Sequence, residues 1–354
     1  MKFLSDPVRI VADDLTGALD AAAPFARPDQ PVGLVLHATE IPNRLALSIS
    51  SESRDSAPAD AAMATISACE LLRQADAGAQ ALWFHKVDSV LRGQPFTATA
   101  AMMTHLDLPR CLFAPAFPAM GRITSGGMQL VRIGSDWIHA AQSDIVAGLL
   151  AAGLIPASES EGHTSAASAL VVDASKQDDL DQAVARQIDP CLLWVGSRAL
   201  AEALAGAVVP VRCPPFAVIV MGTAHPATRA QVAFAGERLT PAAESGPIRP
   251  VPGGKCVIVD AVAHSANAAL TRAAVRRAAL RIDAEGLEGR SLFVTGGETL
   301  SIVLKAVGAR SLDCVGEVGP GLPISIVRGG RLDGCSIISK SGGFGVPDLM
   351  KRYC

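Results

Sequence analysis

Charged side chains follow several apolar runs in the first half of the chain, at the points where those runs end. The run VRIVA (8–12) is followed directly by Asp13 and Asp14, two adjacent carboxylates. Two like charges at such close range cost free energy unless a metal, a cation or a polar ligand engages them. The pair therefore marks a candidate functional site.

Three further runs end in polar residues: LALSIS (45–50), ALWFH (81–85) and RCLFAP (110–115). The residues that follow are Ser51, Ser53 and Arg54; then Lys86, Val87, Asp88, Ser89 and Arg92; then Arg122, Thr124 and Ser125. Taken singly, each is as readily a helix cap or a turn former as a ligand-binding group. Together they favour a small, anionic, hydroxyl-rich ligand, because guanidinium groups grip a planar carboxylate at two points and lysine adds a compact charge.

The elements that must position these residues are short strands alternating with Ala/Leu-rich segments of helical length. This alternation predicts an α/β fold with largely parallel sheets flanked by helices. Ligands bind beyond the carboxyl ends of parallel strands, so the four polar loops are expected at one rim. A chain of 354 residues is expected to form two domains. We place the boundary between the two domains in the proline-containing stretch 206–216, which gives domains at 1–208 and 209–354.

Glycine-rich turns follow strands in the second half. VTGGETLSIVL (294–304) places Gly296, Gly297, Glu298 and Thr299 at a strand-to-helix turn, and the amides of a helix N-terminus suit phosphates. ISKSGGFG (338–345) combines Lys340 with Gly342 and Gly343, whose N–H groups can form an anion nest. A third turn contains Gly222, Thr223 and His225, and VGEVGPGLPIS (315–325) is a candidate fourth glycine-rich wall. Neither a Walker A loop nor G-x-G-x-x-G is present, but the turns together favour a nucleotide-binding domain.

Composition excludes several classes of protein. A formal net charge of −3 and the absence of an aromatic series argue against nucleic-acid binding. No apolar run is long enough for a membrane span, and the eight cysteines include no C-x-x-C, so we expect a reduced, cytoplasmic protein. The histidines show no H-E-x-x-H or H-x-H spacing, so no dedicated metal site is predicted. His85 and His225 are candidates for ligand contact, but each is interpreted as a satisfied strand-end histidine.

Seven motifs, in this order and at about these separations, resemble the four-carbon acid sugar kinases from about residue 8 to 348. They are ADDLTGALD (12–20), SESR (51–54), KVDSVLRG (86–93), APAFPAMGRITSGG (114–127), VGSRALA (195–201), VTGGET (294–299) and KSGGFG (340–345). The resemblance implies an acid-sugar-binding N-terminal domain, a nucleotide-binding C-terminal domain and a ligand site in the interdomain cleft. It implies that the sugar acid meets Asp13, Asp14, Arg54 and residues 86–89, and that ATP meets Gly222, Thr223, residues 296–299 and the stretch near Gly342.

We therefore predict an ATP-dependent kinase of carbohydrate metabolism. It would phosphorylate a four-carbon sugar acid such as threonate, erythronate or 3-oxo-tetronate on its terminal hydroxyl, with Mg²⁺ bridging the phosphates and few direct protein ligands. Arg54 with Lys86 or Arg92 is expected to grip the substrate carboxylate. Asp14 and Asp88 are equal candidates for the residue that orients or deprotonates the hydroxyl.

Two other functions remain open from the sequence. A metal-dependent lyase or aldolase acting on small sugar acids would use the first-domain carboxylates as Mg²⁺ ligands and leave the glycine turns without a role. A non-catalytic sugar-acid sensor would bind the ligand without releasing ADP. The expected partner is a small-molecule sugar acid, with no nucleic acid and no membrane, and homodimer formation is left open.

Overall fold

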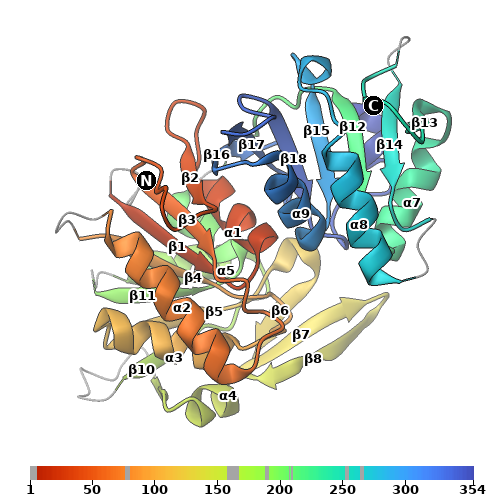
Figure 1. The fold of residues 1–354 in the computed structure, drawn as a ribbon. Coiled ribbons are helices and arrows are strands. Elements are labelled where there is room, and N and C mark those ends of the chain that lie inside the picture. The colour runs from red at the N-terminus through yellow and green to blue at the C-terminus, as the bar shows by residue number, and fades with distance from the viewer. Residues whose placement is uncertain are drawn as a thin grey trace. The chain divides into compact units, whose positions relative to one another are not determined.

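The computed structural model describes residues 6–75, 80–157, 167–187, 191–206, 208, 210–251, 255–263 and 267–354. These form two compact α/β units (Figure 1). Unit 1 comprises Met1–Phe25 and Asn43–Val208, and unit 2 comprises Ala26–Pro42 and Val209–Cys354. The predicted α/β class with largely parallel strands flanked by helices is confirmed.

Seven strands of unit 1 lie in the order β3-β1-β4-β11-β5-β10-β9, and all neighbouring pairs are parallel. Their bounds are β1 Val8–Ala12, β3 Ala46–Ser50, β4 Leu82–Lys86, β5 Arg110–Ala114, β9 Ile155–Ala157, β10 Ser168–Val171 and β11 Leu192–Gly196. Every residue of β1, β4 and β11 is buried. Parallel strands covered on both faces need such continuous apolar runs, which is why the sequence marks them clearly.

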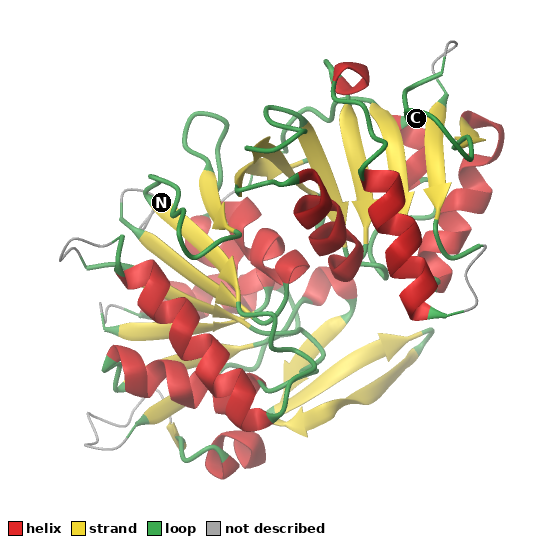
Figure 2. Cartoon of the chain, viewed as in Figure 1, coloured by secondary structure: helices red, strands yellow, loops and turns green. Residues whose placement is uncertain are grey.

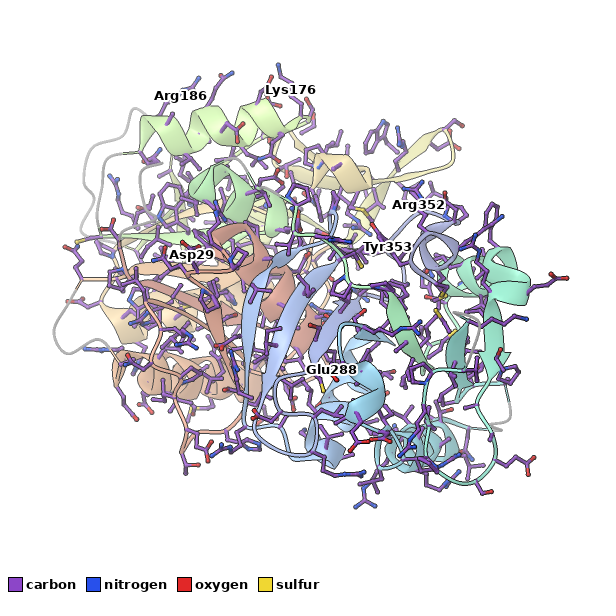
Figure 3. All side chains as sticks on the ribbon, turned by 90° about the horizontal axis from the view of Figure 1, so that it is seen from above. Asp29, Lys176, Arg186, Glu288, Arg352 and Tyr353 are labelled. Atoms are coloured by element: carbon purple, nitrogen blue, oxygen red, sulfur yellow. The ribbon has the colours of Figure 1, made fainter. Side chains whose placement is uncertain are left out.

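Helices cover this sheet in two groups. α2 (Pro58–Arg73) packs against α3 (Pro95–Leu106), and both lie in front of the strands in Figure 2. α1 (Leu15–Ala22) packs against α6 (Arg198–Ala205), which also contacts α5 (Gln177–Arg186). Lys176 and Arg186 mark the two ends of α5 in Figure 3. All eight residues of α1 are buried, so the start of this helix is held firmly beside the strand ends.

A small antiparallel sheet in unit 1 was not predicted. It comprises β6 (Arg122–Ser125), β7 (Met128–Ile133) and β8 (Asp136–Asp144). β7 and β8 are the long pair of strands in Figure 2, and the helix α4 (Ile145–Ala151) follows β8 in the chain. Most of β8 is exposed, so its sequence lacks the apolar run that marks a buried strand. The β6–β7 turn uses Gly126 and Gly127 at positive φ, a conformation that favours glycine.

Unit 2 contains a parallel region and an antiparallel region. The parallel strands lie in the order β13-β14-β12-β15-β18, and β17, β16 and β2 continue the sheet in antiparallel pairs. Their bounds are β2 Val32–Val35, β12 Phe216–Met221, β13 Leu239–Pro241, β14 Cys256–Asp260, β15 Ser291–Thr295, β16 Ser311–Glu317, β17 Pro323–Arg328 and β18 Ser336–Lys340. The stretch 315–325, a candidate ligand wall in the sequence, forms the hairpin between β16 and β17.

The segment Ala26–Pro42, placed in the first domain by the sequence, groups with unit 2. The reason is backbone pairing, because the fully buried β2 pairs with β16. Among the described residues of unit 2, α7 (Pro226–Ala235) contacts α10 (Leu349–Tyr353), and α8 (Ala268–Ala279) contacts α9 (Gly297–Val307). None of the described helices has the length and apolar character needed to cross a membrane.

The core of unit 2 is built around two stacked aromatic rings. The ring centroids of Phe216 and Phe293 lie 4.4 Å apart, and both side chains are fully buried. Tyr353 of α10, labelled in Figure 3, brings its ring to 5.4 Å from that of Phe216. The C-terminal helix is therefore attached to the strands that position the glycine turns.

Replacing Phe293 by Ala is expected to lower the free energy of unfolding of unit 2 by about 3–5 kcal/mol, because it leaves a cavity beneath the stack. The matched control is Phe234→Ala on α7, where the side chain is 52% exposed and the expected change is about 0.5 kcal/mol. Urea unfolding followed by circular dichroism measures both. Equal losses in the two variants would contradict the assignment of this core.

Candidate functional site

The first candidate site lies at the carboxyl ends of β3, β1 and β4. The chain order runs from β1 to β3 on one side and then to β4 on the other, so a topological switch point lies between β1 and β4. Parallel α/β sheets bind ligands at such points. Asp13 and Asp14 follow β1, Arg54 comes from the loop after β3, and Lys86 is the last residue of β4.

The guanidinium of Arg54 connects the carboxylates of this site. Its Nε and Nη2 donate to the two oxygens of Asp13 at 2.8 and 2.6 Å, and its Nη1 donates to Asp14 Oδ2 at 2.5 Å. Nη2 also lies 3.8 Å from Asp88 Oδ2. Burial acts to lower the pKa of Arg54, but the hydrogen bond to Asp13 and the surrounding negative charges raise it. Arg54 is the cation that allows Asp13 and Asp14 to be neighbours.

The two adjacent aspartates have different environments. Asp14 caps α1: its Oδ1 accepts from the Gly17 N–H at 2.6 Å, and its Oδ2 accepts from the Thr16 hydroxyl at 2.9 Å. A Cβ at position 17 would lie 2.5 Å from Asp14 Oδ1, so this cap requires glycine. Among the described hydrogen bonds, the side chain of Asp13 accepts only from Arg54. Burial raises the pKa of Asp13, and the hydrogen bonds and charge of Arg54 oppose that shift.

Asp88 is held ionised by the loop that follows β4. Its Oδ1 accepts from the N–H groups of Val90 and Arg92, and its Oδ2 accepts from Arg92 Nη2 at 2.6 Å. Burial acts to raise the pKa of Asp88, but the hydrogen bond from Arg92 and the charges of Arg54, Arg92 and Lys86 outweigh it and leave the pKa below its ordinary value. A carboxylate of this kind accepts hydrogen bonds well and takes up a proton poorly.

The remaining predicted residues of unit 1 surround this cluster. The Lys86 ammonium is buried; it donates to the Val87 carbonyl at 3.0 Å and lies under the start of α1, where a Cβ on Gly17 would be 3.4 Å away. The Ser89 carbonyl accepts from Gln129 of β7 at 2.7 Å. Burial lowers the pKa of Arg122, and the charge of Asp88 opposes this shift. Direct contacts join Arg54 to Asp13, Asp14 and Asp88, and Asp88 to Arg92, while the ligand-binding role of each predicted residue stays a prediction.

Sequence reasoning missed three contributors. Gln129 supports the Ser89 loop and accepts from the Thr124 hydroxyl at 2.7 Å. Asp20 and Arg198 are buried next to each other, with 4.0 Å between Arg198 Nε and Asp20 Oδ1. Burial raises the pKa of Asp20, and the charges of Lys86 and Arg198 oppose this shift. The signal was available, because Asp20 is a buried carboxylate in a helix with no other charged residue.

The second candidate site lies at the carboxyl ends of β12, β15 and β18. The chain leads from β12 to β13 and β14 on one side and then to β15 on the other, so the switch point lies between β12 and β15. Gly222 follows β12, and a Cβ there would collide with Thr299 Oγ1. Gly296, with φ of 95°, precedes α9, and no side chain of the described residues caps this helix, so its first amides are candidate donors to a ligand. Glu298 instead pairs with Arg272 at the surface.

Lys340 ends β18 and lies almost fully buried beneath the glycine loop 341–346. Its Nζ donates to Thr228 Oγ1 at 2.7 Å and to the carbonyls of Gly342 and Ser341 at 3.2 and 3.3 Å. Thr228 in turn donates to the Gly342 carbonyl at 2.8 Å. Burial lowers the pKa of Lys340 to about 7. All three ammonium protons have protein acceptors, so Lys340 shapes the loop; its direct contact with a cofactor stays a prediction.

Among the described residues, no group of three or more His, Cys, Asp or Glu side chains is arranged to hold a metal ion. The clustered carboxylates of unit 1 face Arg54 and Arg92 instead.

Comparisons with known proteins match two family models to this chain and find related kinases. Residues 8–161 match the family model of a sugar-binding N-terminal domain, and residues 257–350 match that of a nucleotide-binding C-terminal domain. The D-threonate kinase of Bordetella bronchiseptica is 30% identical over 98% of this chain and 96% of its own length. The 3-oxo-tetronate kinase of Pseudomonas savastanoi pv. phaseolicola is 27% identical over 97% and 95%.

Two solved structures share the fold. A protein from Salmonella typhimurium LT2 superimposes with a TM-score of 0.73 at 22% identity and covers 98% of both chains. A protein from Haemophilus influenzae gives a TM-score of 0.66 at 19% identity, covering 97% of this chain and 98% of its own. At these identities the likeness concerns the fold alone.

Arg54→Met is expected to lower the free energy of unfolding by about 3–5 kcal/mol, because it leaves buried carboxylates without their cation. Arg249→Met is the control: Arg249 also pairs with an aspartate, but its side chain is 59% exposed, and its loss should cost less than about 1 kcal/mol. Urea unfolding measures both. A cost for Arg54→Met as small as that of the control would show that the carboxylates do not depend on this guanidinium.

The lowered pKa of the buried Lys340 should make the stability of the folded protein depend on pH. Its pKa falls from 10.5 in the unfolded chain to about 7 in the folded protein. Between these values the unfolded chain binds more protons, so the free energy of unfolding rises with pH through this window and is lowest below it. From about pH 6.5 to about pH 8.5, wild type should gain at most about 2 kcal/mol over Lys340→Met. Lys351→Met, which removes an exposed lysine, should retain the rise; parallel profiles for wild type and Lys340→Met would contradict the prediction.

Proposed function

Because the chain belongs to the four-carbon acid sugar kinase family, we propose that it transfers the γ-phosphate of ATP to the terminal hydroxyl of a four-carbon sugar acid. One observation carries this proposal beyond the family. In each unit the polar or glycine-rich loops gather at the topological switch point of its sheet, where α/β proteins bind ligands. Unit 1 offers charges suited to a sugar acid, and unit 2 offers amides suited to phosphates.

The sugar-acid carboxylate is held by the cations of unit 1. Arg54 has five N–H donors, of which three are used by Asp13 and Asp14, so one N–H on each terminal nitrogen remains for a ligand. Arg92 is the more accessible partner, since its side chain is 57% exposed while it donates to Asp88. Lys86 adds a buried positive charge beneath α1. Hydroxyl groups of the substrate would donate to the aspartate oxygens.

The transfer itself needs a positioned hydroxyl and compensation of the phosphate charge, because its transition state is loose. Asp14 and Asp88 both accept from several protein donors, which fixes the direction of their oxygens. A fixed carboxylate can orient the attacking hydroxyl even when the carboxylate accepts the hydroxyl proton only late in the transfer. We retain both residues as candidates for this role.

The nucleotide phosphates are held by unit 2. The open amides at the start of α9 and the loop above Lys340 supply hydrogen-bond donors and the positive end of a helix dipole. Gly222 and Gly296 keep this surface free of side chains, and Thr223 and Thr299 supply hydroxyls beside it. When bound with ATP, Mg²⁺ would neutralise phosphate charge.

A panel of tetronic and 3-oxo-tetronic acids in a coupled ADP-release assay tests the proposal. At least one four-carbon acid should release ADP, and only with ATP and Mg²⁺ present. Turnover without nucleotide would favour a lyase, and tight acid binding without ADP release would favour a sensor.

The same assay assigns the carboxylate that orients the hydroxyl. Asp14→Asn keeps the helix cap, because asparagine caps as well as aspartate. Whichever of Asp14→Asn and Asp88→Asn removes the orienting group should lower kcat roughly 100-fold and leave the sugar-acid KM within about threefold. Unchanged kcat in both variants would remove both residues from the role.

A further inference from the structure

The glycine loop of unit 2 turns its carbonyl groups toward α7. The carbonyls of Ser341 and Gly342 accept from Lys340 Nζ, and those of Phe344 and Val346 accept from the amide of the buried Gln231 at 3.0 and 3.2 Å. The backbone contains no cis peptide among the described residues. In a trans peptide the C=O of one residue and the N–H of the next point in opposite directions.

The amides that follow these carbonyls therefore point away from Lys340 Nζ and Gln231 Nε2. These are the N–H groups of Gly342, Gly343 and Gly345, and the described residues provide no hydrogen-bond partner for any of them. Three amides without a described partner in a short glycine stretch offer hydrogen-bond donors suited to an anion. The buried contacts of Lys340, Thr228 and Gln231 fix this loop in place.

His225 stands beside this loop with a defined tautomer. It is the N-cap of α7, and its Nδ1 accepts from the Ala227 N–H at 3.2 Å. The lone pair on Nδ1 is thereby used, so the proton of the neutral ring lies on Nε2. A Cβ built on Gly343 would be 3.2 Å from Nε2, and one built on Gly342 would be 3.0 Å from Thr223 Oγ1. His225 Nε2 therefore lies close to Gly343, in the loop whose amides have no partner among the described residues.

We propose that His225 is a phosphate-binding residue, whose Nε2–H donates to a phosphate oxygen of the bound nucleotide beside the amides of Gly342 and Gly343. The inference rests on the proposed function in one respect, namely that the ligand is a nucleoside polyphosphate. Position 225 lies outside residues 257–350, which match the nucleotide-binding domain model. The capping bond to Ala227 gives the ring a second role, since it both starts α7 and orients Nε2–H.

Two substitutions separate capping from phosphate binding. Asn places its Oδ1 where Nδ1 lies, so His225→Asn keeps the cap and leaves no group at the Nε2 position. Gln reaches the Nε2 position with an amide N–H but caps poorly, so His225→Gln keeps the phosphate donor and loses the cap. Each variant removes one function of the same ring.

The measurements are ADP binding by isothermal titration calorimetry and Tm by differential scanning fluorimetry, both on the full chain. His225→Asn should raise the ADP Kd about tenfold and leave Tm within about 1 °C of wild type. His225→Gln should lower Tm by about 3 °C and keep Kd within about threefold. Wild-type affinity in His225→Asn, or an equal loss of affinity in the two variants, would overturn the inference.

Titration of wild type with ADP in the absence of sugar acid keeps this inference distinct from the proposed function. If wild type binds ADP and turns over a sugar acid while His225→Asn binds ADP equally well, only the role of His225 is wrong. If wild type binds ADP but turns over no four-carbon acid, the proposed substrate is wrong, and the Asn and Gln variants still test the phosphate contact. Absence of ADP binding by wild type would overturn both.

Discussion

The fork of Arg54 against Asp13 and Asp14 is the interaction on which the first site depends. Two carboxylates in sequence, with a third on the next loop, would repel one another at the edge of a buried sheet. One guanidinium makes hydrogen bonds to both neighbours and lies within ion-pair distance of Asp88. The strand order makes this possible, because β1 lies between β3 and β4 and so brings the three loops together.

Unit 2 uses a buried cation for a different purpose. Lys340 gathers carbonyl oxygens under the glycine loop, and the opposite faces of those peptides then present N–H groups outward. Arg54 makes a cluster of anions tolerable, whereas Lys340 converts a flexible stretch into an ordered set of donors. In both units a buried basic side chain organises the backbone or side chains that a ligand would meet.

The structure also gives several predicted residues a role inside the protein. Asp14 caps a helix, Asp88 fixes the Arg92 side chain, and Lys340 has an acceptor for every proton. Such internal bonds are compatible with ligand binding, since a positioned group needs its own supports. They change what a substitution does: loss of one of these side chains alters neighbouring geometry as well as any direct contact with a ligand.

The sequence by itself determined the buried parallel strands and the residues that follow them. The reason is that continuous β-branched runs and polar turns are local signals, and β1, β15 and the loops after them were found in this way. The family resemblance also followed from short motifs. Only the tertiary structure decided which segments pair and which donors reach a side chain. β2 belongs with β16, β7 supports the Ser89 loop, and Asp20 lies beside Arg198. These contacts join residues far apart in the chain, and neither periodicity nor composition encodes the partner of a strand or of a buried charge.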